Sequence, residues 1–285
     1  PGVSQWQNGA GACGAGARVR AYASGPGWRI YHGDALEVLP ELEGIGALVT
    51  DPPYSSGGQF RGDRCGQGTR AKYASSDSMA AKLLPEFTGD NRDQRGFLLW
   101  ASLWLAAAHR RAVPGAVAVC WSDWRQLPTV ADAVQVAGWV WRGVGTWHKT
   151  VARPRLGGLW AGSEHFVFAT KGPLAEHGRG VPSVLTASPI AGAKRLHLAE
   201  KPEPVMRWAL GVVPPGSLVV DPFAGSGSTL RAAVDLGFEA VGVELDESFC
   251  EVAARRMAQR SLAGELAELE APGVGGLESL QGGPP

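Results

Sequence analysis

The sequence predicts an α/β protein built on an open sheet, and three observations lead to this fold class. A short apolar run over 48–50 stops abruptly at the motif DPPY, residues 51–54. A second apolar run over 217–221 leads into a glycine-rich stretch, a helix-like segment and a further apolar run that ends at Glu244. Between these two units, runs of strand length alternate with segments of helical periodicity.

Seven segments have the apolar or alternating pattern of strands. We expect strands over 28–31, 47–50, 115–121, 139–149, 164–170, 217–221 and 239–244. The run over 115–121, GAVAVCW, is apolar enough to be buried on both faces. The runs over 139–149 and 164–170 alternate, which favours an antiparallel pair.

Helices are expected between these strands. They cover 35–39, 91–111, 124–137, 203–211, 227–236 and 247–263. The segment 91–111 has an amphipathic pattern with Phe97, Trp100 and Trp104 on its apolar side. Gly138 closes the predicted helix over 124–137. Prolines begin the predicted helix over 203–211.

The remaining segments read as loops and termini. Residues 1–27 are rich in Gly, Ala and Ser and are expected to be a flexible arm, and 271–285 is a Gly/Pro-rich tail without a basic residue, expected to be disordered. Residues 55–90 lack strong periodicity, and a loop of this length is usually functional or disordered. A lid that contacts substrate and a solvated insertion both fit it.

Basic residues are concentrated in one part of a chain that is neutral overall, with 27 Lys and Arg against 27 Asp and Glu. From 142 to 201 there are nine basic residues and three acidic ones. Such a patch can bind phosphates even at zero net charge, although a solvated surface would have the same composition.

Composition excludes several classes of protein. No apolar run is long enough to span a membrane, and no secretory signal is visible at the amino end. The four cysteines, Cys13, Cys65, Cys120 and Cys250, are scattered without a CxxC pair. This pattern argues against a zinc site or a disulfide framework, so we expect no metal and a cytoplasmic location.

The motif DPPY places a carboxylate and an aromatic ring on a stiff turn. Prolines lack the backbone donor and fix φ, so Pro52 and Pro53 end the strand. Asp51 and Tyr54 then lie at the carboxyl end of a strand, which is where ligands bind in open α/β sheets. Taken alone, an ordinary turn explains the motif equally well.

The second motif, DPFAGSGST over 221–229, follows a strand and opens a helix. Glycines allow a tight turn and a close approach to a ligand, and the helix N-terminus presents free N–H groups to an anion. The loop is too short for the pyrophosphate pattern of dinucleotide sites. Glu244 follows about 20 residues later, where such folds place an acid that accepts hydrogen bonds from ribose hydroxyls.

The two motifs together resemble those of the S-adenosylmethionine-dependent amino-methyltransferases of DNA, which methylate N6 of adenine or N4 of cytosine. The catalytic motif precedes the cofactor motif, an order that marks the β class of that family. His32-Gly33-Asp34 and the stretch LAEKP over 198–202 resemble two further family motifs, with Glu200 in place of the usual Gln. The lid after DPPY looks like versions carried by phages and prophages.

The resemblance covers roughly 28–260 and implies a doubly wound, mixed seven-stranded sheet of the Rossmann-like methyltransferase fold. It implies a methyltransferase domain over 28–270, between the flexible arm over 1–27 and the disordered tail over 271–285 that the composition predicts. Within the domain, 55–90 would be the lid loop and 142–195 the target-recognition region. It also implies S-adenosylmethionine as cofactor and double-stranded DNA as substrate. Family members often dimerise, which leaves a homodimer open.

Site residues follow from the same resemblance. The catalytic set is Asp51, Pro52, Pro53 and Tyr54. The cofactor-binding set is Asp34, Lys201, Asp221, Phe223, Ala224, Gly225, Ser226, Gly227, Glu244 and Leu245. The DNA-binding set is Arg61, Arg64, Arg70, Lys72, Lys149, Arg153 and Arg155. For Lys201, a contact to the cofactor's carboxylate end and a structural ion pair are both open.

The resemblance favours adenine N6 as the target because the catalytic motif begins with Asp rather than Ser. Methylation of cytosine N4 is the first alternative. RNA or protein-glutamine methyltransferases also use a related motif, but they usually place the glycine loop first. A catalytically silent DNA-binding subunit is opposed by the intact DPPY and glycine loop.

Overall fold

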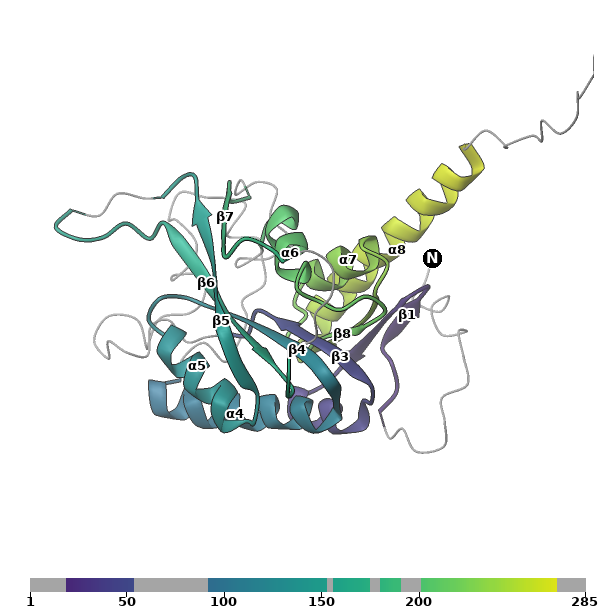
Figure 1. Cartoon of the computed structure of the whole chain (residues 1–285). Coiled ribbons are helices and arrows are strands. Elements are labelled where there is room, and N and C mark those ends of the chain that lie inside the picture. The colour runs from purple at the N-terminus through teal and green to yellow at the C-terminus, as the bar shows by residue number, and fades with distance from the viewer. Residues whose placement is uncertain (1–18, 54–91, 153–155, 175–179, 191–200, 271–285) are drawn as a thin grey trace, which may run out of the picture.

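The computed structural model of the chain describes residues 19–53, 92–152, 156–174, 180–190 and 201–270. These residues form one nine-stranded sheet in the order β1-β2-β9-β8-β3-β4-β6-β5-β7, with helices on both faces (Figure 1). The fold class predicted from the sequence is therefore confirmed. Among the described residues, no helix has the length and apolar character needed to cross a membrane.

The elements follow one another along the chain as a mixed series. The strands are β1 (Ala23–Gly25), β2 (Trp28–His32), β3 (Ile45–Thr50), β4 (Ala112–Ser122), β5 (Val140–Lys149), β6 (Ser163–Thr170), β7 (Val184–Ala187), β8 (Leu218–Asp221) and β9 (Glu239–Glu244). The helices are α1 (Ala35–Val38), the short 3-10 helix η2 (Leu39–Glu41), α4 (Gln94–Arg111), α5 (Leu127–Val136), α6 (Glu203–Leu210), α7 (Ser228–Asp235) and α8 (Glu247–Glu270).

The centre of the sheet is parallel. Strands β2, β9, β8, β3 and β4 pair in parallel, whereas β6 runs antiparallel to both β4 and β5. The chain continues outward from β3 to β4 on one side and from β8 to β9 on the other, so the topological switch point lies between β3 and β8. Open α/β sheets bind ligands beyond the carboxyl ends of the strands at such a point.

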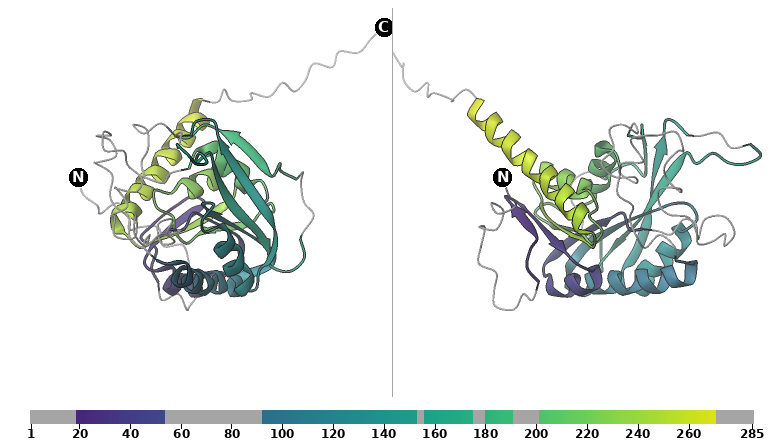
Figure 2. Two further views of the ribbon diagram at one scale, coloured as in Figure 1. Left: turned by 90° about the vertical axis from the view of Figure 1, so that its left-hand side faces the viewer. Right: turned by 180° about the vertical axis from the view of Figure 1, so that it is seen from behind.

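Two hydrophobic layers cover the sheet. On one face, α1, α4 and α5 pack against it, with Phe97 and Trp104 among the fully buried side chains. On the other face, α6, α7 and the first turns of α8 form the second core layer, which includes Met206 and Leu230. Figure 2 shows these layers from two further sides, with α8 continuing beyond the sheet.

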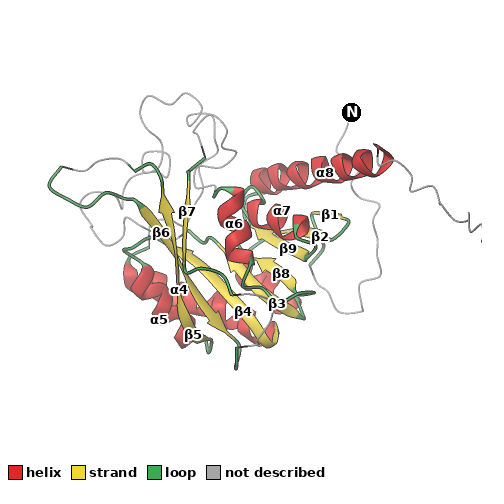
Figure 3. Cartoon of the chain, turned by 45° about the horizontal axis from the view of Figure 1, so that its top comes forward, coloured by secondary structure: helices red, strands yellow, loops and turns green. Residues whose placement is uncertain are grey.

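The recognition region expected over 142–195 forms one end of the sheet. Strands β5 and β6 pair antiparallel, as their alternation predicts, with Trp147 opposite Glu164. The described parts of the connection between them, 150–152 and 156–162, project away from the body of the protein (Figure 3). Strand β7 extends the sheet by pairing in parallel with β5.

All seven expected strands are present, and the predicted number of strands is corrected by two short ones, β1 and β7. Strand β1 lies inside the stretch 1–27 that we expected to be a flexible arm, where it pairs with β2 through a turn at Gly27 (φ 74°). Both added strands are at the edges and are too short to give a periodic signal.

Two helix starts differ from the prediction by three residues. Helix α4 begins at Gln94 rather than at 91, where Asp93 caps it by accepting a hydrogen bond from the N–H of Gly96 at 2.7 Å. Helix α5 begins at Leu127 rather than at 124, because the Asp123 carboxylate accepts hydrogen bonds from the backbone N–H groups of Arg125 and Gln126 at 2.9 and 3.1 Å. These bonds hold 124–126 in a turn. The predicted tail, 271–285, lies outside the described residues.

Candidate active site

The two sequence motifs meet at the switch point of the sheet. Asp51 follows the last residue of β3, and Asp221 is the last residue of its neighbour β8. The hydroxyl of Thr50 is buried and donates a hydrogen bond to Oδ1 of Asp221 at 2.7 Å. This bond ties the residue before the DPPY motif to the end of the strand that precedes the glycine loop.

Asp51 presents one engaged and one available carboxylate oxygen. Its Oδ2 accepts a hydrogen bond from the ammonium of Lys201. Its Oδ1 is buried and has no hydrogen-bond partner among the described residues. Burial raises the pKa of Asp51 to about 6, against the opposing effect of Lys201. A buried acceptor without a donor is costly unless a ligand supplies one.

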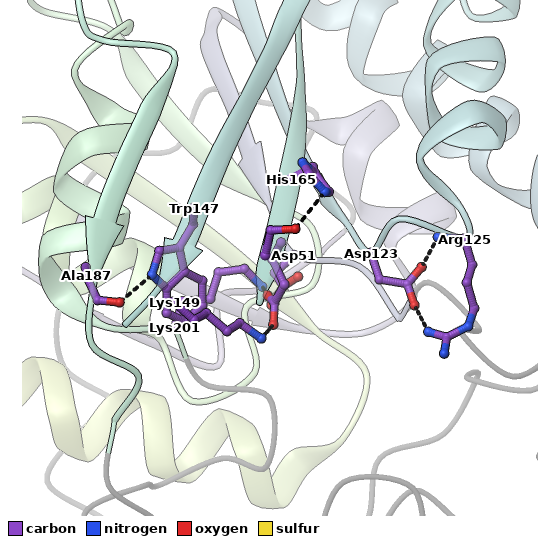
Figure 4. A network of polar contacts seen from close by, with 10 residues as sticks. Asp51, Asp123, Arg125, Trp147, Lys149, His165, Ala187 and Lys201 are labelled. Carbon is purple, nitrogen blue, oxygen red and sulfur yellow. Dashed lines mark hydrogen bonds and ion pairs between the residues drawn. The ribbon is translucent and has the colours of Figure 1, made fainter. Parts of the chain in front are cut away.

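Lys201 is the centre of a buried charge network that spans four elements (Figure 4). Its Nζ contacts Asp51 and lies 3.3 Å from Oε2 of Glu164 on β6. The other oxygen of Glu164 accepts a hydrogen bond from Lys149 at 2.6 Å. Two ammonium groups and two carboxylates therefore balance in charge, and the side chain of Lys201 is only 3% exposed.

The titration of this network follows from its contacts. Burial would lower the pKa of Lys201, but Asp51 and Glu164 outweigh it, and the pKa of Lys201 is raised. Burial would raise the pKa of Glu164, but Lys201 and Lys149 hold it below its ordinary value. Aromatic faces complete the shell: Nζ of Lys201 lies 4.9 Å from the ring centroid of Trp121, and Nζ of Lys149 lies 5.1 Å from that of Trp147.

The glycine loop is organised around two carboxylates. Asp221 accepts a hydrogen bond from the backbone N–H of Phe223 at 3.0 Å, and burial raises the pKa of Asp221 to about 6. Glu244 accepts one backbone N–H on each oxygen, from Gly225 at 2.8 Å and from Asp246 at 2.9 Å. Gly225 has a left-handed backbone with φ 49°, which favours glycine at the centre of the loop.

Gly227 has a packing role in addition to its place in the loop. It is the N-cap of α7 with φ 79°, and a Cβ at this position would lie 3.1 Å from the Cβ of Ala253 on α8. The glycine therefore allows α7 to begin directly against α8.

The loop residues fit a nucleoside ligand of the type that the sequence predicts. Glu244 is half-buried, and each of its oxygens keeps acceptor capacity beyond the single N–H that it receives. Ribose hydroxyls are the donors that such an acid takes in this fold. Burial raises the pKa of Glu244, opposed by the N–H donors of Asp246 and Gly225.

Aromatic side chains of α4 line the same region. The ring of Phe223 lies 5.1 Å from those of both Trp100 and Trp104. The guanidinium of Arg92 stacks on Trp100 at 4.2 Å from the ring centroid. Asp34 is exposed at the start of α1, where its Oδ1 accepts the N–H of Leu36 at 2.8 Å.

Some of the other predicted residues lie in the described part of the chain, and the rest lie outside it. Pro52, Ala224 and Ser226 are buried, Pro53 is half-buried and Leu245 is exposed. The predicted residues outside the described part are Tyr54, Arg61, Arg64, Arg70, Lys72, Arg153 and Arg155.

Part of the predicted basic patch makes internal contacts. Lys149 and Lys201 belong to the charge network, and Lys171 donates to the carbonyl oxygens of His109 and Ala112 at 2.7 and 2.8 Å. Arg142 donates to Thr170 and Gly172 at 3.0 and 2.9 Å. The charge count of the segment therefore overstates the basic groups that face outward.

Sequence reasoning missed three residues that shape the site: Thr50, Glu164 and Trp100. Each acts through a contact with a residue far away in the sequence. Of these three, Glu164 had a signal in the sequence: an acidic residue within a strongly basic segment can be expected to form an internal ion pair.

A family model described as "DNA methylase" matches residues 175–255, a segment that includes Lys201, the glycine loop and Glu244. This part of the chain is therefore similar to DNA methylases. The predicted resemblance to DNA amino-methyltransferases is thereby confirmed, and S-adenosylmethionine, from which that family takes its methyl group, is the predicted cofactor that goes with it.

Two bacterial relatives extend the likeness beyond the segment that the family model matches. The putative methylase YubD of Escherichia coli (strain K12) is 27% identical over 236 residues, which are 81% of this chain and 90% of that protein. The DNA adenine methyltransferase YhdJ of the same organism is 34% identical over 84 residues, 28% of this chain and 29% of that protein.

Solved structures of DNA methyltransferases have the same fold as this chain. The M1.HpyAVI–SAM complex has a TM-score of 0.57 at 21% identity, covering 81% of this chain and 98% of that one. The cytosine-N4-specific PvuII DNA methyltransferase has a TM-score of 0.57 at 16% identity, covering 80% and 85%. At these identities the likeness establishes the methyltransferase fold.

Proposed function

We propose that the chain methylates the N6 amine of a flipped-out adenine in double-stranded DNA, with S-adenosylmethionine as the methyl donor. One observation carries the proposal: Oδ1 of Asp51 is a buried acceptor without a donor among the described residues, at the edge of the sheet where the glycine loop lies. An exocyclic amine supplies the N–H group that this oxygen lacks.

The described residues divide the work of binding and orientation. S-adenosylmethionine, when bound, supplies an activated methyl group. Glu244 accepts hydrogen bonds from the ribose of the cofactor, and Asp34 faces the amine of the cofactor's adenine. Phe223 packs against the cofactor. The fixed N–H donors on Glu244 hold its carboxylate in one orientation, so the acid is preorganised for this contact.

Asp51 prepares the amine rather than forming a bond to it. The lone pair of an exocyclic amine is delocalised into the base, which makes the nitrogen a poor nucleophile. The carboxylate of Asp51 and the carbonyl oxygen of Pro52 accept its two N–H bonds and favour sp³ geometry. Transfer is then an in-line displacement that depends on orientation and electrostatics, and the proton leaves afterwards.

The target base has to leave the duplex to reach Asp51. We assign Tyr54 as the ring on which the flipped base stacks. Arg61, Arg64, Arg70 and Lys72 of the lid, with Arg153 and Arg155 of the recognition region, would hold the DNA, chiefly through phosphates. Lys149 is the predicted DNA-binding residue that lies in the described part of the chain, and its charge is paired with Glu164.

Adenine is favoured over cytosine by two observations. Asp51 at the first position of the motif resembles adenine-specific members, and YhdJ, a relative over part of the chain, is named as a DNA adenine methyltransferase. Cytosine N4 is the alternative, and the fold does not separate the two, since the cytosine-N4-specific PvuII enzyme has it as well.

Incubation with tritiated cofactor and DNA, followed by digestion to nucleosides and chromatography, tests the proposal. We expect label in N6-methyladenine. Label only in N4-methylcytosine contradicts the choice of base, and label only when RNA is supplied contradicts DNA as substrate.

A further inference from the structure

Strands β5 and β6 form a hairpin in the expected recognition region, which we call the recognition hairpin. Glu164 connects this hairpin to the ion pair of Asp51 and Lys201. It is on β6, opposite Trp147 of β5. One of its oxygens is 3.3 Å from Nζ of Lys201, and the other accepts a hydrogen bond from Lys149 at 2.6 Å. Lys149 is the last residue of β5, immediately before the segment that projects from the sheet.

The ammonium of Lys201 therefore has two competing carboxylates. Alone with Asp51, a lysine could approach both carboxylate oxygens, because its three N–H donors rotate freely on a flexible stem. Glu164 draws the ammonium to the side of Oδ2, and Oδ1 is left without a partner among the described residues. The oxygen that the target amine needs is thus kept open by a residue that does not touch it.

We propose that Glu164 is a positioning residue for methyl transfer: it holds Lys201 on Oδ2 of Asp51 so that Oδ1 remains available to the target amine. This inference rests on the proposed function of Asp51. Glu164 also fixes Lys149, which connects the position of the catalytic carboxylate to the base of the recognition hairpin.

The electrostatics of the site provide a second readout. The charged groups that bear on Asp51 are Lys201, Glu164 and Asp221, from α6's start, β6 and β8. Glu164 raises the pKa of Asp51, whereas Lys201 lowers it. Loss of the negative charge of Glu164 is therefore expected to move the acid limb, the fall in rate as pH decreases, to lower pH. An ion pair with a purely structural role, far from the reaction, would not have this effect.

Glu164→Gln is the test variant, because glutamine keeps the shape and loses the charge. We expect kcat for methyl transfer to fall by on the order of tenfold to a hundredfold, the range that a misplacement of about 1 Å produces. The KM values for S-adenosylmethionine and DNA are expected to change little, and the acid limb to move to lower pH.

Glu203→Gln is the matched control, since it makes the same change at an exposed glutamate whose ion pair, with Arg207 of α6, lies outside the charge network. We expect near wild-type kcat in this variant. Glu164→Asp keeps the charge and shortens the side chain by one methylene, so it is expected to fold, to retain the wild-type acid limb and to have an intermediate kcat. It also serves if the glutamine variant does not fold.

Wild-type kcat and an unshifted acid limb in folded Glu164→Gln would overturn the inference. So would an equal loss of kcat in Glu203→Gln, because the effect would then not depend on the contact between Glu164 and Lys201. If only Glu164→Asp folds, wild-type kcat in that variant would overturn it as well. Absence of any methyl transfer by the wild type would instead contradict the proposed function.

Discussion

The ionisation of Asp51 sets how the reaction depends on pH. Burial raises the pKa of Asp51 to about 6, so the acceptor that the amine needs is lost within a readily accessible range. With this pKa, the ionised fraction is about 0.9 at pH 7 and about 0.1 at pH 5. The rate of methyl transfer is therefore expected to fall about tenfold between pH 7 and pH 5.

Single-turnover transfer of a tritiated methyl group to DNA, at saturating cofactor, isolates this step. Asp221 has a pKa of about 6 as well, so it has to be separated from Asp51. The variant Asp221→Asn keeps an oxygen to accept the hydrogen bonds from Thr50 and Phe223. Its acid limb is expected to persist and to move slightly to lower pH, because the charge of Asp221 contributes to the raised pKa of Asp51.

A flat rate between pH 5 and pH 7.5 in protein that circular dichroism shows to be folded would refute this reasoning. If the fall in rate at low pH disappears in Asp221→Asn, the titrating group is Asp221 and not Asp51, which would also refute the reasoning.

Three further predictions follow from the same geometry. Asp51→Ala is expected to abolish transfer while isothermal calorimetry still detects cofactor binding; lost binding would contradict the role of Asp51. Asp221→Asn is expected to raise stability at pH 7.5 by up to about 3 kcal/mol, because a buried carboxyl with a raised pKa stabilises the fold below its unfolded pKa and loses that contribution as pH rises through about 6. The gain should be about half as large at pH 5, and thermal melts at both values that show no gain would contradict it. Glu244→Gln is expected to weaken cofactor binding roughly 10- to 100-fold by calorimetry, as loss of a hydrogen bond to a charged group does, whereas exposed Glu247→Gln should bind normally.

The parts of the fold that the sequence predicts are those with local signals. The run before DPPY and the run before the glycine loop are apolar and end in residues that stop a strand, so β3 and β8 could be located with their carboxylates. Their adjacency was not predicted and is a finding of the structure, and the hydrogen bond from Thr50 to Asp221 shows how close the two motifs lie. Strands β1 and β7 were missed, because three or four residues carry no periodicity.

The charge network could not be predicted, because it depends on tertiary contacts between distant residues. Lys201 and Asp51 are 150 positions apart, and the sequence left open whether Lys201 meets the cofactor or an ion pair. The structure places it in an ion pair with two carboxylates. Counting charges over 142–201 likewise could not separate Lys149 and Lys171, which make internal contacts, from residues that face outward.

The central claim is that Asp51 serves methylation of adenine in DNA. It is tested most directly by expressing the chain in a host without DNA methylation and detecting modified bases by sequencing of its genomic DNA. We predict N6-methyladenine at one recurrent sequence, absent when Asp51→Ala is expressed at the same level. N4-methylcytosine alone, or unmodified DNA in a host that contains folded wild-type protein, would contradict the claim.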